Sequence, residues 1–185
     1  MSFCLWLTGL PGSGKSTILK ELLKLLSGSG IEAVTLSLDR IRKVLTPEPA
    51  YTDEERGIVY RSLVMMAHLL VKEGGRHVII DATGNRRAFR ELGRWLIPDF
   101  AEVYIRCPLA TCMEREALRK VRPVQKDLYQ RAKKGTLTGE MPGVTAPYEA
   151  PEHPEVEIQS DVLSPRESAE KITVYVQSRW ADPML

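Results

Sequence analysis

The sequence predicts an α/β fold in which helices cover both faces of a parallel sheet, a three-layer α/β/α arrangement. Short apolar runs alternate with segments of helical apolar spacing along most of the 185 residues. Near the start, residues 9–16 read GLPGSGKS, a glycine-rich turn between an apolar run and an amphipathic segment. The length suits one domain over residues 1–185, and no linker marks a second one.

Each expected element has a local signal. Four strands are predicted from apolar runs, at residues 3–7, 33–38, 77–80 and 103–105. Helices are predicted at residues 17–26, 52–72, 86–96 and 109–118, with a last one starting at 164. Thr52 and Glu55 have the spacing of a capping box, and Ser164 precedes a proline at the first helical position.

The glycine-rich turn fits the pattern GxxxxGK[ST] at every position. Its glycines allow turns that aim successive backbone N–H groups at an anion, at the start of a helix. The pattern therefore predicts a nucleoside triphosphate site with Lys15 at the β- and γ-phosphates and the Ser16 hydroxyl on Mg²⁺. We expect Lys15 to be solvated when no nucleotide is bound. The expected phosphate-binding residues are Gly12, Ser13, Gly14, Lys15, Ser16 and Thr17.

Two carboxylates end the predicted strands that follow. Asp39 closes the second strand beside Arg40 and Arg42, and Asp81 closes the third. Ligands of open α/β sheets bind at this edge, where an acid can ligate Mg²⁺ or accept the proton of an attacking hydroxyl. Asp39 is expected to serve the acceptor and Asp81 the metal; the alternative for Asp81 is an N-cap of the next helix. Arginines beside Asp39 suit an anionic second substrate.

The segment of about 119–154 breaks the alternation, because apolar periodicity fades and glycine and proline become frequent. Residues 115–134 hold eight basic side chains against two acidic ones. In an enzyme that handles phosphates, such a segment predicts a mobile lid, with Arg115 on ATP. A solvated basic surface is the alternative, and a nucleic-acid patch is less favoured because Tyr129 is the single aromatic in the basic run.

Composition narrows the class further. A formal charge of +2 does not by itself indicate a nucleic-acid partner. Three cysteines without CxxC spacing argue against a disulfide framework or a zinc site. The longest apolar run is too short to cross a bilayer, and the first residues carry no basic segment of a secretory signal. We therefore expect a cytoplasmic protein without a membrane partner.

Several stretches resemble the adenylylsulfate kinases. Residues 4–17 (CLWLTGLPGSGKST) are similar to the phosphate-loop signature of that family. Three further stretches are similar to motifs of the family: residues 38–42 (LDRIR) to LDGDNVR, residues 51–56 (YTDEER) to FSxxxR, and residues 126–129 (KDLY) to KGLY. Residues 147–151 match the family motif PYEAP at every position. The resemblance covers about residues 3–174 and implies a P-loop kinase with a five-stranded parallel sheet and a mobile lid.

The resemblance also implies an activity: ATP, with Mg²⁺, phosphorylates the 3′-hydroxyl of adenylyl sulfate to give 3′-phosphoadenylyl sulfate and ADP. Lys15 and Asp39 would then be catalytic. Tyr51 would stack on the acceptor adenine with Met141 over its other face, and Arg42 and Arg56 would hold the anionic end. Such kinases are often homodimers, whereas nucleic acid is not an expected partner.

Departures from the family keep two other functions open. Arg40 stands where the family has Asn, Val59 replaces a substrate-contacting Asn, and Met141 replaces an aromatic. Residues 81–86 (DATGNR) look more like polynucleotide-kinase-type and toxin-type phosphotransferases. The same chemistry on another nucleotide-like or sugar-phosphate hydroxyl is therefore one alternative. A nucleotide-binding regulator without catalysis is the other.

Overall fold

A computed structural model describes residues 2–118, 128–136 and 139–180. Its five strands form one parallel sheet in the order β2-β3-β1-β4-β5. The strands are β1 (Cys4–Thr8), β2 (Ala33–Ser37), β3 (His77–Asp81), β4 (Phe100–Arg106) and β5 (Val156–Gln159). The described helices are α1 (Lys15–Gly28), α2 (Leu38–Leu45), α3 (Asp53–Lys72), α4 (Arg87–Leu96), α5 (Leu109–Ala117), α6 (Leu128–Lys133) and α7 (Pro165–Trp180).

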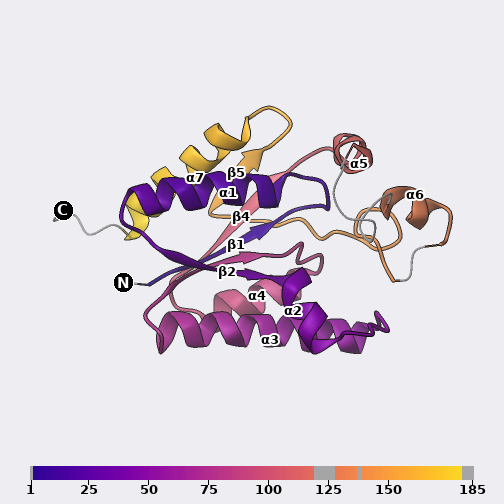
Figure 1. Cartoon of the computed structure of the whole chain (residues 1–185), viewed down its shortest axis with the longest axis horizontal. Coiled ribbons are helices and arrows are strands. Elements are labelled where there is room, and N and C mark those ends of the chain that lie inside the picture. Colours follow the sequence, from indigo (N-terminus) through magenta and orange to yellow (C-terminus); the bar gives the residue numbers. More distant parts are fainter. Residues whose placement is uncertain (1, 119–127, 137–138, 181–185) are drawn as a thin grey trace.

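Helices cover both faces of the sheet, as predicted (Figure 1). Alternate residues of β1 point to opposite faces, so Leu5 and Leu7 pack with α1 and α7, while Cys4 and Trp6 pack with α3. A strand that is buried on both sides reads as a continuous apolar run, which is why the β1 segment shows no polar alternation. The predicted three-layer arrangement is confirmed.

Both predicted helix starts are confirmed in their hydrogen bonds. The Thr52 hydroxyl accepts a hydrogen bond of 3.1 Å from the Glu55 N–H. At the start of α7, the Ser164 hydroxyl accepts from the Glu167 N–H at 3.2 Å, and the Glu167 carboxylate accepts from the Ser164 N–H at 2.9 Å. The second pair is a complete capping box.

Three elements differ from the expectation drawn from the residues. A four-residue strand, β5, lies beyond the four strands predicted from apolar runs, since its pattern is too short to stand out. Residues 38–45 form helix α2 where the end of a strand and a loop were expected. A short helix, α6, lies within the segment predicted to be an irregular lid. Of the helices the structure describes, none has the length and apolar character needed to span a membrane.

Candidate active site

The phosphate loop runs from the end of β1 to the start of α1. Gly12 has φ +82°, and a Cβ there would lie 2.4 Å from the carbonyl oxygen of Cys112. Gly14 is the N-cap of α1 with φ +99°. The loop can therefore follow this path only with glycine at residue 12, and it brings the N–H groups at the start of α1 to one side.

Lys15 is held against its own loop. Its Nζ donates hydrogen bonds to the carbonyl oxygens of Gly9 at 2.8 Å and Leu10 at 2.9 Å, and the residue is 9% exposed. The expectation of a solvated lysine was wrong, because the loop carbonyls stand in for water around the ammonium group. The same contacts fix where the charge lies before a phosphate arrives.

The two predicted acids meet the phosphate loop in one cavity of about 180 Å³. Its lining includes Lys15, Ser16, Asp39 and Asp81. The Ser16 hydroxyl donates a hydrogen bond of 2.8 Å to the Asp81 carboxylate. Asp39 lies in the first turn of α2. Residues from β3, α1 and α2 thus converge, as the carboxyl-edge argument predicted.

The alternative role of Asp81 as an N-cap is wrong, because α4 begins at Arg87 and has Arg86 as its N-cap residue. The Ser16–Asp81 pair supplies oxygen atoms, which Mg²⁺ prefers. No group of three or more His, Cys, Asp or Glu residues suited to a metal occurs in the described part of the chain. A magnesium ion that is held by one carboxylate, a hydroxyl and nucleotide phosphates needs no such group, so the residues fit Mg²⁺ bound with a nucleotide.

A larger cavity of about 550 Å³ is lined by Gly14, Thr17 and Arg115 together with the loop that follows β5. One guanidinium nitrogen of Arg115 donates to the Ser160 carbonyl oxygen at 2.7 Å. The Ser160 hydroxyl donates to the Ser13 carbonyl oxygen at 2.7 Å. The sequence analysis found Arg115 but missed Ser160, whose partner in the phosphate loop lies 147 residues away.

Arg42 and Tyr51, which were expected at the acceptor, lie together. The Arg42 guanidinium carbon is 5.3 Å from the centre of the Tyr51 ring, within the range of a cation–π contact. Arg42 also pairs with Glu55 at 3.2 Å. Gly139 packs on the ring, since a Cβ there would lie 2.7 Å from Tyr51 Cγ.

Arg56 is 6% exposed and pairs with Glu140 at 3.0 Å. Its Nε is buried without a hydrogen-bond partner among the described residues. A buried donor of this kind is costly unless a ligand or water completes it. Arg56, which was expected at the acceptor, therefore has an N–H group that no described residue accepts.

Met141 does not line an open pocket with Tyr51. The residue is 3% exposed and lies in a hydrophobic cluster with Cys107, Cys112, Tyr129 and Ala132. Covering an adenine would require this side chain to leave the cluster. The expected stacking partner of Tyr51 is therefore a buried residue in this structure.

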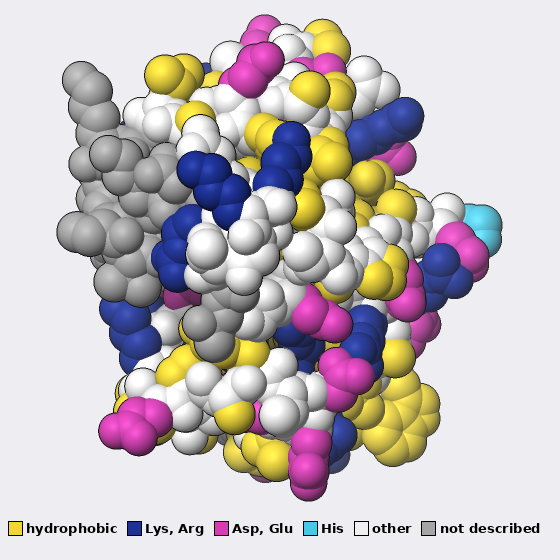
Figure 2. Space-filling view, turned by 90° about the vertical axis from the view of Figure 1, so that its right-hand side faces the viewer, with side chains coloured by type: hydrophobic (Ala, Val, Ile, Leu, Met, Phe, Trp, Pro, Cys, Tyr) yellow, Lys and Arg dark blue, Asp and Glu magenta, His cyan; other side chains and the backbone are white. Residues whose placement is uncertain are grey.

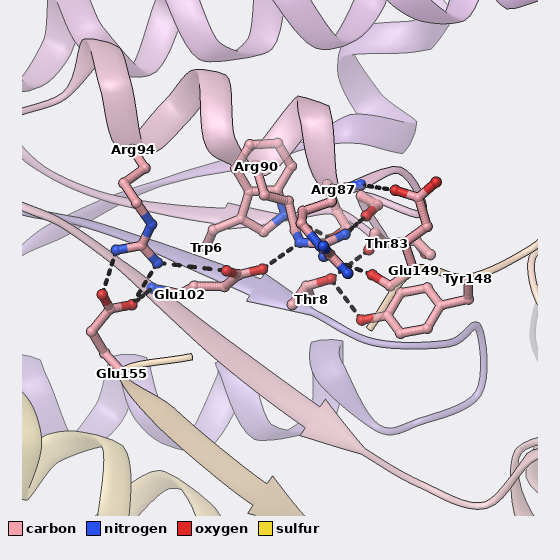
Figure 3. Close-up of polar contacts among 12 residues, drawn as sticks. Trp6, Thr8, Thr83, Arg87, Arg90, Arg94, Glu102, Tyr148, Glu149 and Glu155 are labelled. Atoms are coloured by element: carbon pink, nitrogen blue, oxygen red, sulfur yellow. Dashed lines mark hydrogen bonds and ion pairs between the residues drawn. The ribbon is translucent and has the colours of Figure 1, made fainter. Parts of the chain in front are cut away.

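Residues 147–151, the PYEAP stretch, form a strap that ties β1 to the segment after β3 (Figure 3). The hydroxyls of Tyr148 and Thr8 are 2.9 Å apart, and the Arg90 guanidinium donates to the Glu149 carbonyl oxygen at 2.6 Å. The Glu149 carboxylate accepts from the Arg87 N–H at 2.6 Å. Arg90 also pairs with the buried Glu102. This motif, which carries much of the resemblance, holds the scaffold together.

Packing accounts for part of the stretch at residues 81–86. The Gly84 N–H donates to the Tyr60 hydroxyl at 3.0 Å, and a Cβ at Gly84 would lie 3.1 Å from both Arg90 and Trp6. Arg86 pairs with Asp53 at 2.5 Å. Gly84 and Arg86 therefore have places in the scaffold, whereas Asp81, Ala82 and Thr83 line the cavity beside the phosphate loop.

The segment expected to be a lid lies beside the phosphate loop. The Tyr129 hydroxyl in α6 donates to the Pro11 carbonyl oxygen at 2.6 Å, and the Glu116 carboxylate accepts from the Leu128 N–H at 2.9 Å. Residues 119–127 and 137–138 of the expected lid lie outside the described residues. On this side of the molecule, Lys and Arg side chains are interspersed with Asp and Glu (Figure 2).

A parallel sheet that leads through a GxxxxGK[ST] loop to a lysine, a serine and two carboxylates defines a P-loop phosphotransferase. The model of the family described as adenylylsulphate kinase matches residues 1–159. The chain belongs to this family. The predicted family and the predicted reaction class, transfer of a phosphoryl group from ATP to a hydroxyl, are therefore confirmed.

Proteins of similar sequence and a solved structure of similar fold point to the same family. An adenylyl-sulfate kinase of Picosynechococcus is 36% identical over 90% of this chain and 89% of its own length. One of Thermodesulfovibrio yellowstonii is 37% identical over 96% of this chain and 85% of its own length. The structure of the Mycobacterium tuberculosis APS kinase in complex with AMPPNP and APS has a TM-score of 0.82 and 29% identity, covering 95% of this chain and 98% of that one.

Proposed function

We propose that this chain transfers the γ-phosphoryl group of ATP to the 3′-hydroxyl of adenylyl sulfate, giving 3′-phosphoadenylyl sulfate and ADP. The observation that carries the proposal is the cavity in which Lys15, Ser16, Asp39 and Asp81 meet. Helix α2 carries Asp39 at its first turn and Arg42 in its last, and so joins this cavity to the acceptor arginine. Relatives named as adenylyl-sulfate kinases support the choice of acceptor.

On the donor side, the phosphates of ATP bind the N–H groups of the phosphate loop and the Lys15 ammonium group. Mg²⁺ would be held by the Ser16 hydroxyl and, directly or through water, by Asp81, and it supplies positive charge against the phosphate oxygens. The adenosine half extends into the cavity lined by Thr17 and Arg115. Arg115 is held there by Ser160, so its guanidinium group is in place before ATP binds.

On the acceptor side, Asp39 orients the attacking hydroxyl and accepts its proton. Tyr51 stacks on the adenine. Arg42 and Arg56 bind the anionic end. The Nε of Arg56, which has no hydrogen-bond partner in the described part of the chain, gives that guanidinium group a donor for a charge-assisted hydrogen bond. A role for Met141 at the adenine remains a prediction that requires its side chain to leave the cluster around Tyr129.

The test is the release of ADP from ATP with Mg²⁺, measured with and without adenylyl sulfate. We expect release to depend on adenylyl sulfate, with 3′-phosphoadenylyl sulfate as the second product. Release that depends on a different acceptor, or no release at all, would contradict the proposal.

The Tyr51→Ala variant tests the acceptor site itself. Because base–aromatic stacking contributes about 1–3 kcal/mol, the KM for adenylyl sulfate should rise about fivefold to a hundredfold. The KM for ATP should change little, which makes it the internal control. An unchanged acceptor KM would show that adenine does not stack on this ring. Formation of a homodimer and a cytoplasmic location stay predictions, tested by light scattering and by cell fractionation.

A further inference from the structure

Glu55 contacts both Arg42 and Tyr51, two residues proposed to bind the acceptor, although the sequence analysis gave it only a capping role. We propose that Glu55 is a positioning residue that holds both Arg42 and Tyr51 for the acceptor. This inference rests on the proposed function, since it concerns the site at which adenylyl sulfate would bind.

The carboxylate of Glu55 contacts two separate parts of the chain. One oxygen accepts from the Arg42 guanidinium at 3.2 Å. The other accepts from the backbone N–H groups of Ala50 at 2.6 Å and Tyr51 at 3.2 Å. One side chain thus connects helix α2 to the loop that leads into α3.

These contacts go beyond a helix cap. In a capping box the glutamate side chain reaches back to the N–H of the N-cap residue. Here the N-cap is Thr52, and the Glu55 carboxylate reaches past it to the two residues before the helix. The cap itself comes from the Thr52 hydroxyl, which accepts from the Glu55 N–H. Removing the carboxylate and removing the cap are therefore separable changes.

The backbone at Tyr51 needs such support. Tyr51 has φ +56° and is the one non-glycine residue with positive φ among those described. An aromatic residue in this region is strained and persists only where its surroundings hold it. The hydrogen bond from its N–H to Glu55 holds the backbone, while the Arg42 guanidinium group lies over its ring.

Charge and burial favour the same role. The side chains of Arg42 and Glu55 are 17% and 14% exposed, so their pairing is partly shielded from water and salt. A guanidinium group has five N–H donors, and the pair with Glu55 leaves others for an anionic acceptor. Arg42 is thereby held in one orientation before the acceptor binds, which lowers the cost of binding.

The experiment compares Glu55→Gln with Glu54→Gln, an exposed glutamate in the same turn of α3, and with Thr52→Ala. We expect Glu55→Gln to raise the KM for adenylyl sulfate about tenfold, in the middle of the range for coupled residues, and to leave the KM for ATP within about twofold. Glu55→Asp should recover part of the loss. Glu54→Gln should behave like the wild type.

Thr52→Ala separates stability from positioning. It should lower Tm by about 2–4 °C through the lost cap and leave the acceptor KM near that of the wild type. In an Arg42→Gln background, Glu55→Gln should have a much smaller effect, because the residue on which it acts is gone. Equal rises in both KM values, or a full effect without Arg42, would overturn the inference.

Amide hydrogen exchange at Ala50 and Tyr51 gives a readout that needs no acceptor. Glu55→Ala, which removes the accepting oxygen that glutamine would keep, should speed exchange at these two amides, and Glu54→Ala should not. If adenylyl sulfate fails to stimulate the wild-type enzyme, the proposed function falls, and this measurement still decides on Glu55. Unchanged exchange at both amides would show that the carboxylate does not hold the Tyr51 loop.

Discussion

At the scale of single residues, Lys15 combines a binding role with a folding role. Its ammonium group donates to the carbonyl oxygens of Gly9 and Leu10, so the loop itself contacts the charge that a nucleotide phosphate would meet. Phosphate binding therefore exchanges one set of partners for another. The residue matters to the protein both with and without ATP.

Lys15→Ala should lower kcat at least about a hundredfold, since one charge aimed at the transition state contributes roughly 3 kcal/mol. It should also lower the free energy of unfolding by about 1–3 kcal/mol, because two loop carbonyls lose a charged donor. The measurements are ADP release and thermal melting, with the exposed Lys20→Ala of the same helix as control. Full activity would contradict the role of the loop, and an unchanged Tm would contradict the folding role.

Asp39 and Asp81 line one cavity from different elements, so their roles should separate. Asp81 accepts from the Ser16 hydroxyl, and Asp81→Asn should raise the Mg²⁺ concentration needed for half-maximal rate. Asp39→Asn removes the proton acceptor and should lower kcat by about 10²–10⁴ with little change in the KM for ATP. The measurement is the rate of ADP release by each variant over a series of Mg²⁺ concentrations. Identical defects in the two variants would remove the distinction.

At the scale of elements, the strap at residues 147–151 and strand β5 depend on a network of charges at the sheet edge (Figure 3). Glu155 takes part in it, binding Arg94 at 2.9 Å and the Glu102 N–H at 2.7 Å. Burial alone would raise the pKa of the Glu155 carboxyl. The bonds from Arg94 and from the Glu102 N–H outweigh burial and hold this pKa below its usual value of 4.5.

A carboxyl whose pKa is lowered in the folded protein contributes stability above its unfolded pKa, and this is lost as the pH falls through the folded value. Glu155→Gln should therefore lower Tm at about pH 7 and flatten the fall of Tm between about pH 6 and pH 3. Melting curves over that range test this. The control is Glu152→Gln, whose side chain is 62% exposed in its pair with Arg87. A parallel fall in the wild type and Glu155→Gln would argue against the network.

At the scale of the whole molecule, closure over the substrates should be confined to part of the expected lid. Residues 128–136 and 139–146 precede the strap in the chain, and Leu128 lines the smaller cavity. Residues 147–151, by contrast, are bonded to β1 and to α4. With an ATP analogue and adenylyl sulfate, hydrogen exchange should slow in the first two stretches. The strap should be protected in both states. Fast exchange of the strap in the empty protein would contradict this boundary.

The successful predictions rest on neighbouring residues or on a pattern that repeats along the chain. The phosphate loop, the two helix caps and the acids at the strand ends need only neighbouring residues and the rule that parallel strands end at one edge. Met141 and Glu55 show where this reasoning stopped. Met141 was assigned to the adenine by resemblance but is buried among residues of α5 and α6. The sequence pattern indicated only a capping role for Glu55. Its contact with Arg42 could not be predicted, because it depends on how α2 packs on α3.

The sequence by itself determined the class of protein, because a phosphate loop is a contiguous motif whose backbone geometry is encoded by its own glycines. It also determined the layered architecture, because alternating strand and helix patterns leave few arrangements. The tertiary structure alone decided the strand order, the position of the fifth strand β5 in the chain and the contact of Ser160 with the phosphate loop. These features depend on residues that are far apart in the chain and come into contact only when the helices and strands pack. A local sequence pattern does not show which distant residue each of them contacts.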